Sequence, residues 1–347
     1  MSNNKKKLSL PPVGLLNLSK NNSKKYKKKY NNSYLYNTCY INASIQCLFR
    51  LEELIDNVLN CSGGKLLQAT KNLINKMRNS NENSKLSVLE IKDAMAEYDE
   101  KYNDIYPEDA NEFISDYLNG LLKETLIKDN QIVNKISINI DNKDESFYHF
   151  LNKFYKNGCS FISDLFCGIL RTKNFCKKCH NIISITYHSF KILDLPLYYL
   201  AKKNINKNLD LEEIIKEFIS EKEISNFICQ KCKVNYYTKT DIYKLPNYLL
   251  IYFKRKVENF YIQNDIINFK TINFTNYLYE KKSDNLNYNL KGNIYYSFYS
   301  NNIGHYSASC LIGDKWYYFD DSEFYFSEEL IEYEEDNLIL LFYEKEK

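Results

Sequence analysis

The stretch that decides the fold surrounds the first cysteine and reads Leu35-Tyr36-Asn37-Thr38-Cys39-Tyr40-Ile41-Asn42-Ala43-Ser44-Ile45-Gln46. Ile41, Ile45 and Leu48 recur at i, i+4 and i+7, a spacing that predicts a helix with one apolar stripe. A side-chain oxygen just before the helix, from Thr38 or Asn37, is expected to cap it. The sequence therefore predicts a loop that delivers a cysteine to the first turn of a helix.

Cys39 would lie in that first turn, where unpaired backbone N–H groups and the positive end of the helix dipole meet. This placement lowers the pKa of a thiol and favours the thiolate, which is the nucleophilic form. The alternative is a small buried packing residue, the usual role of a free cysteine. Five other cysteines lack any metal-ligand spacing and are predicted to be packing residues: Cys47, Cys61, Cys159, Cys167 and Cys310.

Charge is unevenly distributed along the 347 residues. Residues 1–30 contain nine lysines and no acidic residue, so the net charge of +3 leaves −6 for the rest of the chain. We expect a basic, disordered tail at 1–30 and a mildly acidic folded body, which argues against nucleic acid as a partner. No apolar run is long enough for a membrane span, and the polar start lacks a signal-peptide pattern. We therefore expect no membrane partner and a cytoplasmic or nuclear location.

Two Cys-x-x-Cys pairs, Cys176/Cys179 and Cys229/Cys232, are separated by fifty residues. Each pair supplies two thiolates from a tight turn, and four thiolates close the tetrahedral shell of a structural zinc ion. Such pairs without a signal peptide also indicate a reducing compartment. The alternative is four reduced thiols without metal. His180 follows the first pair, and we expect it to be a solvated surface residue rather than a ligand.

The order of the expected elements indicates an α+β fold. We expect helices from about residue 30 to 155. A capping box at 87–90 opens one of them, and Pro107 suits the first turn of another. The segment between the cysteine pairs contains a strand-like run at 182–197 and a capped helix from Asp210 to Phe218. Strands follow from about residue 245, and we expect them at 248–253, 294–299, 305–312, 316–319 and 338–343.

The helix after Pro107 carries a predicted buried stripe of Ala110, Phe113, Ile114, Tyr117, Leu118 and Leu121. Asp109 and Glu112 lie three residues apart in its first turn. They either complement the helix dipole or provide an acidic contact for basic residues of a partner. The residues alone leave both interpretations open.

His305 opens one predicted strand, and Asp320-Asp321 end the next, with a turn at 313–314 between them. If the turn is symmetric, residue 312 pairs with residue 315. Strand side chains alternate between faces, so Asp320 would share the face of His305 and lie diagonally next to it. Asp321 would point to the other face. A three-residue turn would reverse this choice.

A nucleophilic cysteine, a distant histidine and an aspartate that orients the histidine form the arrangement used in papain-like hydrolysis. His305 would take the proton of the Cys39 thiol and later give it to the leaving amine. Asp320 would fix the imidazole tautomer and stabilise the imidazolium.

Five blocks carry a family resemblance when they are taken together. Residues 37–46 are similar to N-T-C-Y-M-N-S-x-L-Q, the Cys box of the ubiquitin-specific proteases. Residues 106–113 are similar to Q-Q-D-A-x-E-F, a helix of the same family. The two cysteine pairs resemble the zinc-bearing fingers of that family of cysteine deubiquitinases. Residues 245–255 resemble its L-P-x-x-L-x-x-x-L-K-R strand, and residues 304–321 contain the likeness to its His box. The blocks follow the family order.

The resemblance implies a papain-like α+β catalytic domain at 31–347 with a thumb, a palm and zinc-ribbon fingers. The thumb would be about 31–155, the fingers about 160–245 and the palm about 246–347. It implies hydrolysis of the isopeptide or peptide bond after the C-terminal glycine of ubiquitin. Ubiquitin and ubiquitinated proteins would be the partners, and a structural zinc ion held by four cysteines the cofactor.

Carried over by position, the catalytic residues are Cys39 as nucleophile, His305 as base and Asp320 as the third triad member. The substrate-binding residues implied by the resemblance are Asp109, Glu112 and Asp321. Asp109 and Glu112 match acidic residues near the basic tail of ubiquitin, and this favours the partner contact. Asp321 matches a second, supporting aspartate.

The sequence departs from the family pattern near the cysteine. The family has an oxyanion-hole Asn five residues before the Cys, where this chain has Tyr34, and a Gly three residues before it, where this chain has Tyr36. Tyr34 could donate a hydrogen bond from its hydroxyl in place of that Asn. Alternatively, residues 14–18 also resemble the start of the Cys box, so a lysine-rich insert would displace the Asn to Asn17. The sequence leaves both possibilities open. In the upstream part of the His box, the family has a His-Ser/Ala-Gly run, and this chain has Tyr296-Ser297-Phe298 instead.

Three functions remain after this comparison. An active deubiquitinase is favoured by the retained Cys, His and Asp. A non-catalytic ubiquitin-binding relative is suggested by the altered oxyanion region. A zinc-ribbon nucleic-acid binder is opposed by the acidic body.

Overall fold

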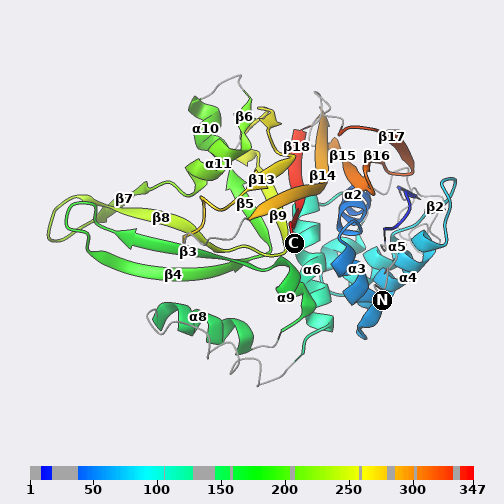
Figure 1. The fold of residues 1–347 in the computed structure, drawn as a ribbon, viewed down its shortest axis with the longest axis horizontal. Helices are drawn as coiled ribbons and strands as arrows, with labels where there is room; N and C mark the ends of the chain where they lie inside the picture. The colour runs from blue at the N-terminus through cyan, green and yellow to red at the C-terminus, as the bar shows by residue number, and fades with distance from the viewer. Residues whose placement is uncertain are drawn as a thin grey trace. The chain divides into compact units, whose positions relative to one another are not determined.

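The computed structural model describes residues 9–17, 38–104, 106–127, 145–156, 159–203, 208–257, 260–279, 286–300, 303–330 and 337–347. The chain divides into two compact units (Figure 1). The first unit contains residues up to Thr125 and from Leu290 to Glu344, and the second contains residues from Leu126 to Asn289 and the last three residues. Within the described residues, no helix is long and apolar enough to cross a membrane.

Helices make up the first part of the first unit, as predicted. They are α2 (Cys39–Leu48), α3 (Glu52–Asn60), α4 (Lys65–Arg78), α5 (Leu89–Met95), the 3₁₀ helix η2 (Glu100–Asn103) and α6 (Ala110–Glu124). The predicted stripe of α6 is buried. The Asp109 carboxylate caps α6 by accepting hydrogen bonds from the backbone N–H groups of Asn111 and Glu112.

The last part of the first unit is an antiparallel sheet. Its strands are β14 (Asn287–Ser300, of which the residues from Leu290 belong here), β15 (Ile303–Ile312), β16 (Lys315–Asp320), β17 (Glu323–Ser327) and β18 (Asn337–Lys345), in the order β17-β16-β15-β14-β18. Four of the predicted strands are confirmed here, as β14, β15, β16 and β18, and β17 was not predicted. The helices and this sheet confirm the α+β class for the unit that holds Cys39 and His305.

α2 packs against β15, β16 and α6, and all of its residues are buried. The sequence predicts one apolar stripe, but the polar side of α2 is buried as well. Residues 10–15 cover that side, and their carbonyl groups accept hydrogen bonds from two α2 side chains and from Arg50, just beyond the helix. The prediction of a disordered tail at 1–30 is therefore wrong for residues 9–17, because Leu10, Val13 and Leu15 are buried apolar side chains. Residues 1–8 and 18–30 lie outside the described residues.

Two predicted helix caps differ from the structure. Thr38 precedes α2, but its side chain does not cap the helix, and Asn37 lies outside the described residues. The Thr38 hydroxyl instead lies 3.5 Å from the carbonyl oxygen of Leu16. Ser87 accepts a hydrogen bond from the N–H group of Leu89, but Glu90 pairs with side chains of α4 rather than closing a capping box.

A long four-stranded sheet dominates the second unit (Figure 1). Its strands are β3 (Gly168–Phe175), β4 (Ile182–Phe190), β7 (Lys222–Ile228) and β8 (Asn235–Lys244), in the order β4-β3-β8-β7. Helix α8 (Glu145–Lys156) lies against β4, with Phe147 and Leu151 packed on Ile169 and Tyr187. The short helix α9 (Phe161–Phe166) leads into β3.

The rest of the second unit contains a parallel pair of strands, β5 (Ile192–Pro196) and β9 (Tyr248–Lys254). The run predicted at 182–197 is therefore two strands, β4 and β5, which separate at a bend at Lys191. Helix α11 (Leu211–Phe218) is capped by Asp210, as predicted. The remaining short elements are α10 (Tyr198–Lys203), β6 (Leu209–Asp210), β10 (Lys256–Val257), β11 (Phe260–Tyr261), β12 (Ile266–Ile267) and β13 (Thr271–Asn273).

One more short strand pair lies in the first unit. β1 (Gly14–Leu15) runs parallel to β2 (Lys85–Leu86) and places the segment 9–17 between α2 and residues 321–322. Gly14 is required at this position, because a Cβ atom built on it would lie 2.1 Å from the carbonyl oxygen of Ser322. The segment thus ends with Asn17 close to the start of α2.

Candidate active site

Cys39 is the first residue of α2, His305 lies near the start of β15 and Asp320 ends β16. His305 Nε2 lies 2.6 Å from Asp320 Oδ1 and 3.9 Å from Asp321 Oδ2. The Cys39 thiol is also a hydrogen-bond partner of His305. The structure therefore brings together the three side chains that the sequence singled out, all within the first unit.

The β15–β16 hairpin has the predicted register. Ile312 pairs with Lys315, and Ala308 pairs with Phe319. The choice of Asp320 over Asp321 as the neighbour of His305 is confirmed by the distances. Asp321 follows with a φ of 50°, a left-handed conformation that turns the chain out of the strand.

His305 is held in its charged form. Burial disfavours the imidazolium, but the hydrogen bonds with Asp320 and Cys39 outweigh burial and raise the pKa of His305 to about 11. The hydrogen bond from His305 lowers the pKa of Asp320, against the opposing effect of burial. At neutral pH the Cys39 sulfur thus faces an imidazolium, the partner that a nucleophilic thiolate needs.

Asn17 lies at the same site, although it precedes Thr38 by 21 positions in the sequence. Its side-chain oxygen accepts a hydrogen bond of 2.9 Å from the backbone N–H group of Thr38, and its Nδ2 donates to Asp321 Oδ2 at 2.7 Å. Asn42 Nδ2 donates to the other oxygen of Asp321, also at 2.7 Å. Tyr34 and Tyr36 lie outside the described residues.

Asp321 connects the two asparagines. Burial raises the pKa of Asp321, while the hydrogen bonds from Asn42 and Asn17 oppose that rise. Asn42 was not singled out from the sequence. Its signal was its place three residues after Cys39, on the same side of α2.

The two acidic residues at the start of α6, Asp109 and Glu112, have different contacts. Asp109 uses Oδ1 to cap the helix, and Tyr306 Oη lies 3.5 Å from its Oδ2. Glu112 is exposed and lies 3.3 Å from Lys101 Nζ. The capping interpretation thus applies to Asp109, while the side chain of Glu112 faces solvent.

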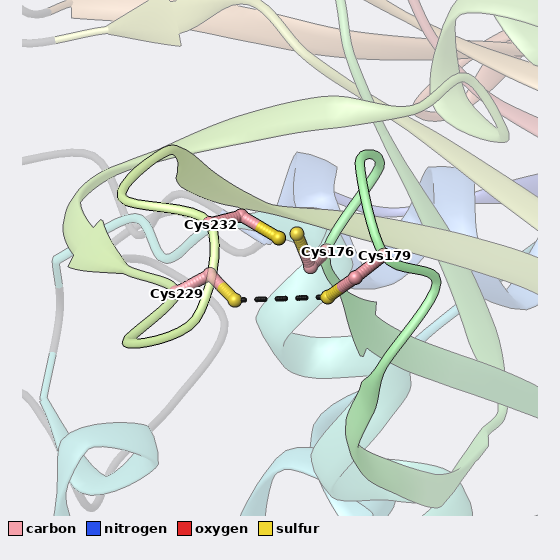
Figure 2. Close-up of side chains that lie close together, drawn as sticks. All are labelled: Cys176, Cys179, Cys229 and Cys232. Atoms are coloured by element: carbon pink, nitrogen blue, oxygen red, sulfur yellow. Dashed lines mark hydrogen bonds between the residues drawn. The ribbon is translucent and has the colours of Figure 1, made fainter.

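The four cysteines of the two Cys-x-x-Cys pairs converge in the second unit, and Figure 2 shows their sulfur atoms pointing toward one another. All four sulfurs lie within 4.8 Å of one another, and the group could hold a metal ion. The two turns have the same backbone pattern. The N–H groups of His180 and Lys233 donate to the carbonyls of Cys176 and Cys229, each at 2.8 Å.

Positive φ angles of 57° and 56° place His180 and Lys233 in the left-handed region, where the turns fold back. The His180 side chain is exposed and outside the sulfur cluster, as predicted. Backbone N–H groups of Cys232 and Lys231 point at the Cys229 sulfur, and the first of these is the main cause that lowers the pKa of Cys229 to about 6. This donor set fits a thiolate-bound cation such as zinc.

Cys47 and Cys310 are packing residues, as predicted. Both are buried, and their sulfurs lie 3.7 Å apart between α2 and β15. Burial raises the pKa of Cys47 well above its usual value, which keeps this thiol protonated and unreactive.

A cysteine at a helix start, paired with a histidine that is held by an aspartate, defines the class of papain-like thiol hydrolases. A family model described as "Ubiquitin carboxyl-terminal hydrolase" matches residues 30–343. The chain belongs to this family, as its sequence resemblance implied.

Curated relatives and solved structures agree with this assignment. The chain is 29% identical to ubiquitin carboxyl-terminal hydrolase Usp2 of Drosophila melanogaster over 82% of its own length and 31% of that protein. It is 25% identical to ubiquitin carboxyl-terminal hydrolase 2 of Bos taurus over 83% of its length and 50% of that protein. The chain thus spans 31% to 50% of the length of these relatives.

Among solved structures, the fold is similar to a chain of the SAGA DUB module of Ubp8, Sgf11, Sus1 and Sgf73 bound to monoubiquitin. The TM-score is 0.68 at 18% identity, covering 98% of this chain and 70% of that one. The same module bound to ubiquitin aldehyde gives a TM-score of 0.68 at 19% identity, covering 99% and 71%. These likenesses confirm the ubiquitin-specific-protease fold.

Proposed function

We propose that this chain is an active thiol-dependent deubiquitinase that cleaves the isopeptide or peptide bond after the C-terminal glycine of ubiquitin. The observation that carries the proposal is the His305–Asp320 contact of 2.6 Å beside Cys39. Family membership supplies the substrate class, and the structural neighbours that are bound to ubiquitin support it. The body that encloses the site is acidic, which suits a substrate with a basic tail.

Cys39, His305 and Asp320 divide the reaction among them. The Cys39 thiolate attacks the carbonyl carbon of the terminal glycine, and the tetrahedral intermediate collapses to a thioester as the amine leaves. The His305 imidazolium gives its proton to that amine. The neutral ring then takes a proton from water, which attacks the thioester and releases ubiquitin. Asp320 keeps the ring oriented through both steps.

We propose Asn17 as the side-chain donor of the oxyanion hole. Its Nδ2 carries two N–H bonds, and Asp321 occupies one of them. The second can reach the oxyanion together with the backbone N–H groups at the start of α2. Asp321 and Asn42 support Asn17 in this position. An asparagine at the site favours the active enzyme over the alternative of a non-catalytic ubiquitin binder.

Glu112, with Asp109 behind it, is the proposed contact for the basic tail of ubiquitin. Glu112 is the more accessible of the two, because the Asp109 oxygens already have partners within the first unit. We propose a location in the cytoplasm or nucleus, because two Cys-x-x-Cys pairs that hold a metal suit a reducing compartment.

The experiment that tests this function is release of a fluorophore from the C-terminus of ubiquitin. We expect saturable release by the wild-type chain and none by Cys39→Ala. A matched substrate with the fluorophore on a related modifier measures the preference for ubiquitin. Binding of ubiquitin by the wild type without any release would favour the non-catalytic alternative.

Asp320→Asn is expected to move the alkaline limb of the pH profile of kcat/KM to lower pH. In the wild type the pKa of His305 is about 11. The ion pair that the imidazolium makes is therefore fully present below the usual histidine pKa, and it is lost only as pH rises through about 11. Removing the carboxylate removes a hydrogen bond that raises the pKa of His305. Kinetics between pH 6 and pH 10 should show no alkaline fall in kcat/KM for the wild type and a clear fall for Asp320→Asn. Glu323→Gln, an exposed carboxyl of the next strand, is the control, and equal limbs in both variants would contradict the assignment.

We propose that Cys176, Cys179, Cys229 and Cys232 hold a structural zinc ion, in the sheet that corresponds to the fingers of the family. Zinc supplies a tetrahedral cross-link that ties the two turns together. Four protein thiolates fill its shell, so this ion has no role in the reaction.

Cys176→Ala is expected to remove the metal and loosen the ends of β3 and β8 that carry the turns, because structural zinc binding is coupled to folding. Metal analysis of protein purified without chelators should give one zinc per wild-type chain and none per variant chain. Hydrogen exchange should rise at residues 174–182 and 227–236. Cys159→Ala is the control and should keep its zinc. A wild-type chain without zinc would refute the site.

A further inference from the structure

Three buried polar side chains follow one side of α2: Asn42, Gln46 and Arg50. Their spacing of i, i+4 and i+8 places them in one row along the helix and just beyond its end. None of the three was given a role by the sequence pattern. Since burying amide and guanidinium groups is costly unless they are hydrogen-bonded, the row must have partners.

The partners are successive carbonyl groups of the segment 9–17. Asn42 Nδ2 donates to the carbonyl oxygen of Leu15 at 3.2 Å, and Gln46 Nε2 donates to that of Val13 at 2.7 Å. Arg50 Nη1 donates to the carbonyl oxygen of Leu10 at 2.7 Å. The row therefore binds the main chain of the segment at three points.

Internal contacts fix the row itself. Arg50 Nη2 donates to Gln46 Oε1 at 2.9 Å, and Arg50 Nε donates to the Gln46 carbonyl oxygen at 3.1 Å. Gln46 thus presents its Nε2 group to the segment in one orientation. Because a guanidinium only donates hydrogen bonds, the Gln46 atom that faces Arg50 must be the oxygen Oε1, and Nε2 then faces the segment.

The segment is held on its other side as well. The N–H group of Leu15 donates to the carbonyl oxygen of Asp321 at 2.8 Å, and that of Leu16 donates to the carbonyl oxygen of Leu86 at 2.7 Å. A slip of one residue would move every carbonyl by about 3.3 Å along the row. Such a slip would separate the Asn17 side chain from Thr38 and Asp321.

We infer that Asn42, Gln46 and Arg50 form an anchor that sets the register of the segment 9–17 and so positions Asn17 at the start of α2. The inference rests on the proposed function, because it assigns a catalytic consequence to residues that do not touch the substrate. The three are positioning residues. Arg50 lies 11 residues beyond Cys39, about 16 Å along the helix direction at 1.5 Å per residue.

The test loosens the segment without changing the helix. Leu10→Asp puts a charge at a buried position of the segment, and Ser9→Asp puts the same charge at the adjacent exposed position as a matched control. Both are made in the full chain. Hydrogen exchange of residues 10–17 reports the segment, and fluorophore release from ubiquitin gives kcat and KM.

We expect Leu10→Asp to speed exchange at residues 10–17 and to lower kcat at least about 10-fold, with KM within about 3-fold of wild type, since the loss falls on the transition state. Ser9→Asp should change neither quantity. Gln46→Leu, which removes one anchor donor, should give the same pattern. If Gln46→Leu does not fold, Leu10→Asp still decides the question, because it leaves α2 intact.

Faster exchange with unchanged kcat would overturn the inference, since the segment would then not position a catalytic group. Unchanged exchange in both Leu10→Asp and Gln46→Leu would overturn it too. A wild-type chain that releases no fluorophore would refute the proposed function instead, and the exchange data would still report whether the anchor exists.

Discussion

Cys39→Ser is expected to abolish turnover while ubiquitin stays bound. The substitution changes one atom of the site and leaves Asn17, His305 and Asp320 in place. A hydroxyl is far less acidic than a thiol, so it does not form the anion that makes Cys39 the nucleophile beside His305. The serine would therefore remain protonated, and we expect kcat to fall at least about 10⁴-fold, the order that follows loss of a triad member.

Fluorophore release and ubiquitin binding measured on the same preparations check this expectation. The dissociation constant should stay close to that of the wild type, because the thiol contributes little contact area. Cys61→Ser is the matched control, since Cys61 lies outside the site, and it should retain full activity. Undiminished cleavage by Cys39→Ser would mean that another residue is the nucleophile.

Asn17→Ala is expected to cost about 10²–10³ in kcat, the loss that follows removal of one oxyanion-hole donor. The change also removes the acceptor of the Thr38 N–H group and a hydrogen bond to Asp321, so the start of α2 loses support. KM should change little, because the oxyanion forms only in the transition state.

Tyr34→Phe is the matched partner of this variant. It removes the only side-chain hydrogen-bond donor of the residue that occupies the expected oxyanion position in the linear sequence. Full activity of Tyr34→Phe together with the loss in Asn17→Ala would assign the donor to Asn17. The reverse result would assign it to Tyr34 and would mean that Asn17 only supports the helix start. Asn79→Ala, an exposed asparagine at the end of α4, controls for the substitution itself.

The parts of the site that local rules control were predicted from the sequence. Strand alternation and a two-residue turn placed Asp320 next to His305, because a hairpin register is fixed by its turn. Cys-x-x-Cys spacing placed four sulfurs in one cluster, because each pair needs only a tight turn. The buried stripe of α6 followed from helical periodicity.

The parts that depend on distant contacts were not predicted. The segment 9–17 was assigned to a disordered tail because its lysine-rich neighbours dominate the composition, whereas its three buried side chains and its carbonyl contacts fix it. Thr38 and Glu90 were expected to cap helices, but each found a partner in another segment. A local pattern shows which groups need a hydrogen bond and leaves open which distant group provides it.

The short distance between Asn17 and Thr38 has a consequence for how this chain tolerates change. The 2.9 Å hydrogen bond joins the two points from which the residues 18–37 start and end. Closing a loop costs free energy that grows only with the logarithm of its length, about 0.6 kcal/mol for each doubling. By this rule, doubling the number of residues between Asn17 and Thr38 would cost about 0.6 kcal/mol, so the contact that closes the site depends only weakly on how far apart its two partners lie in the sequence.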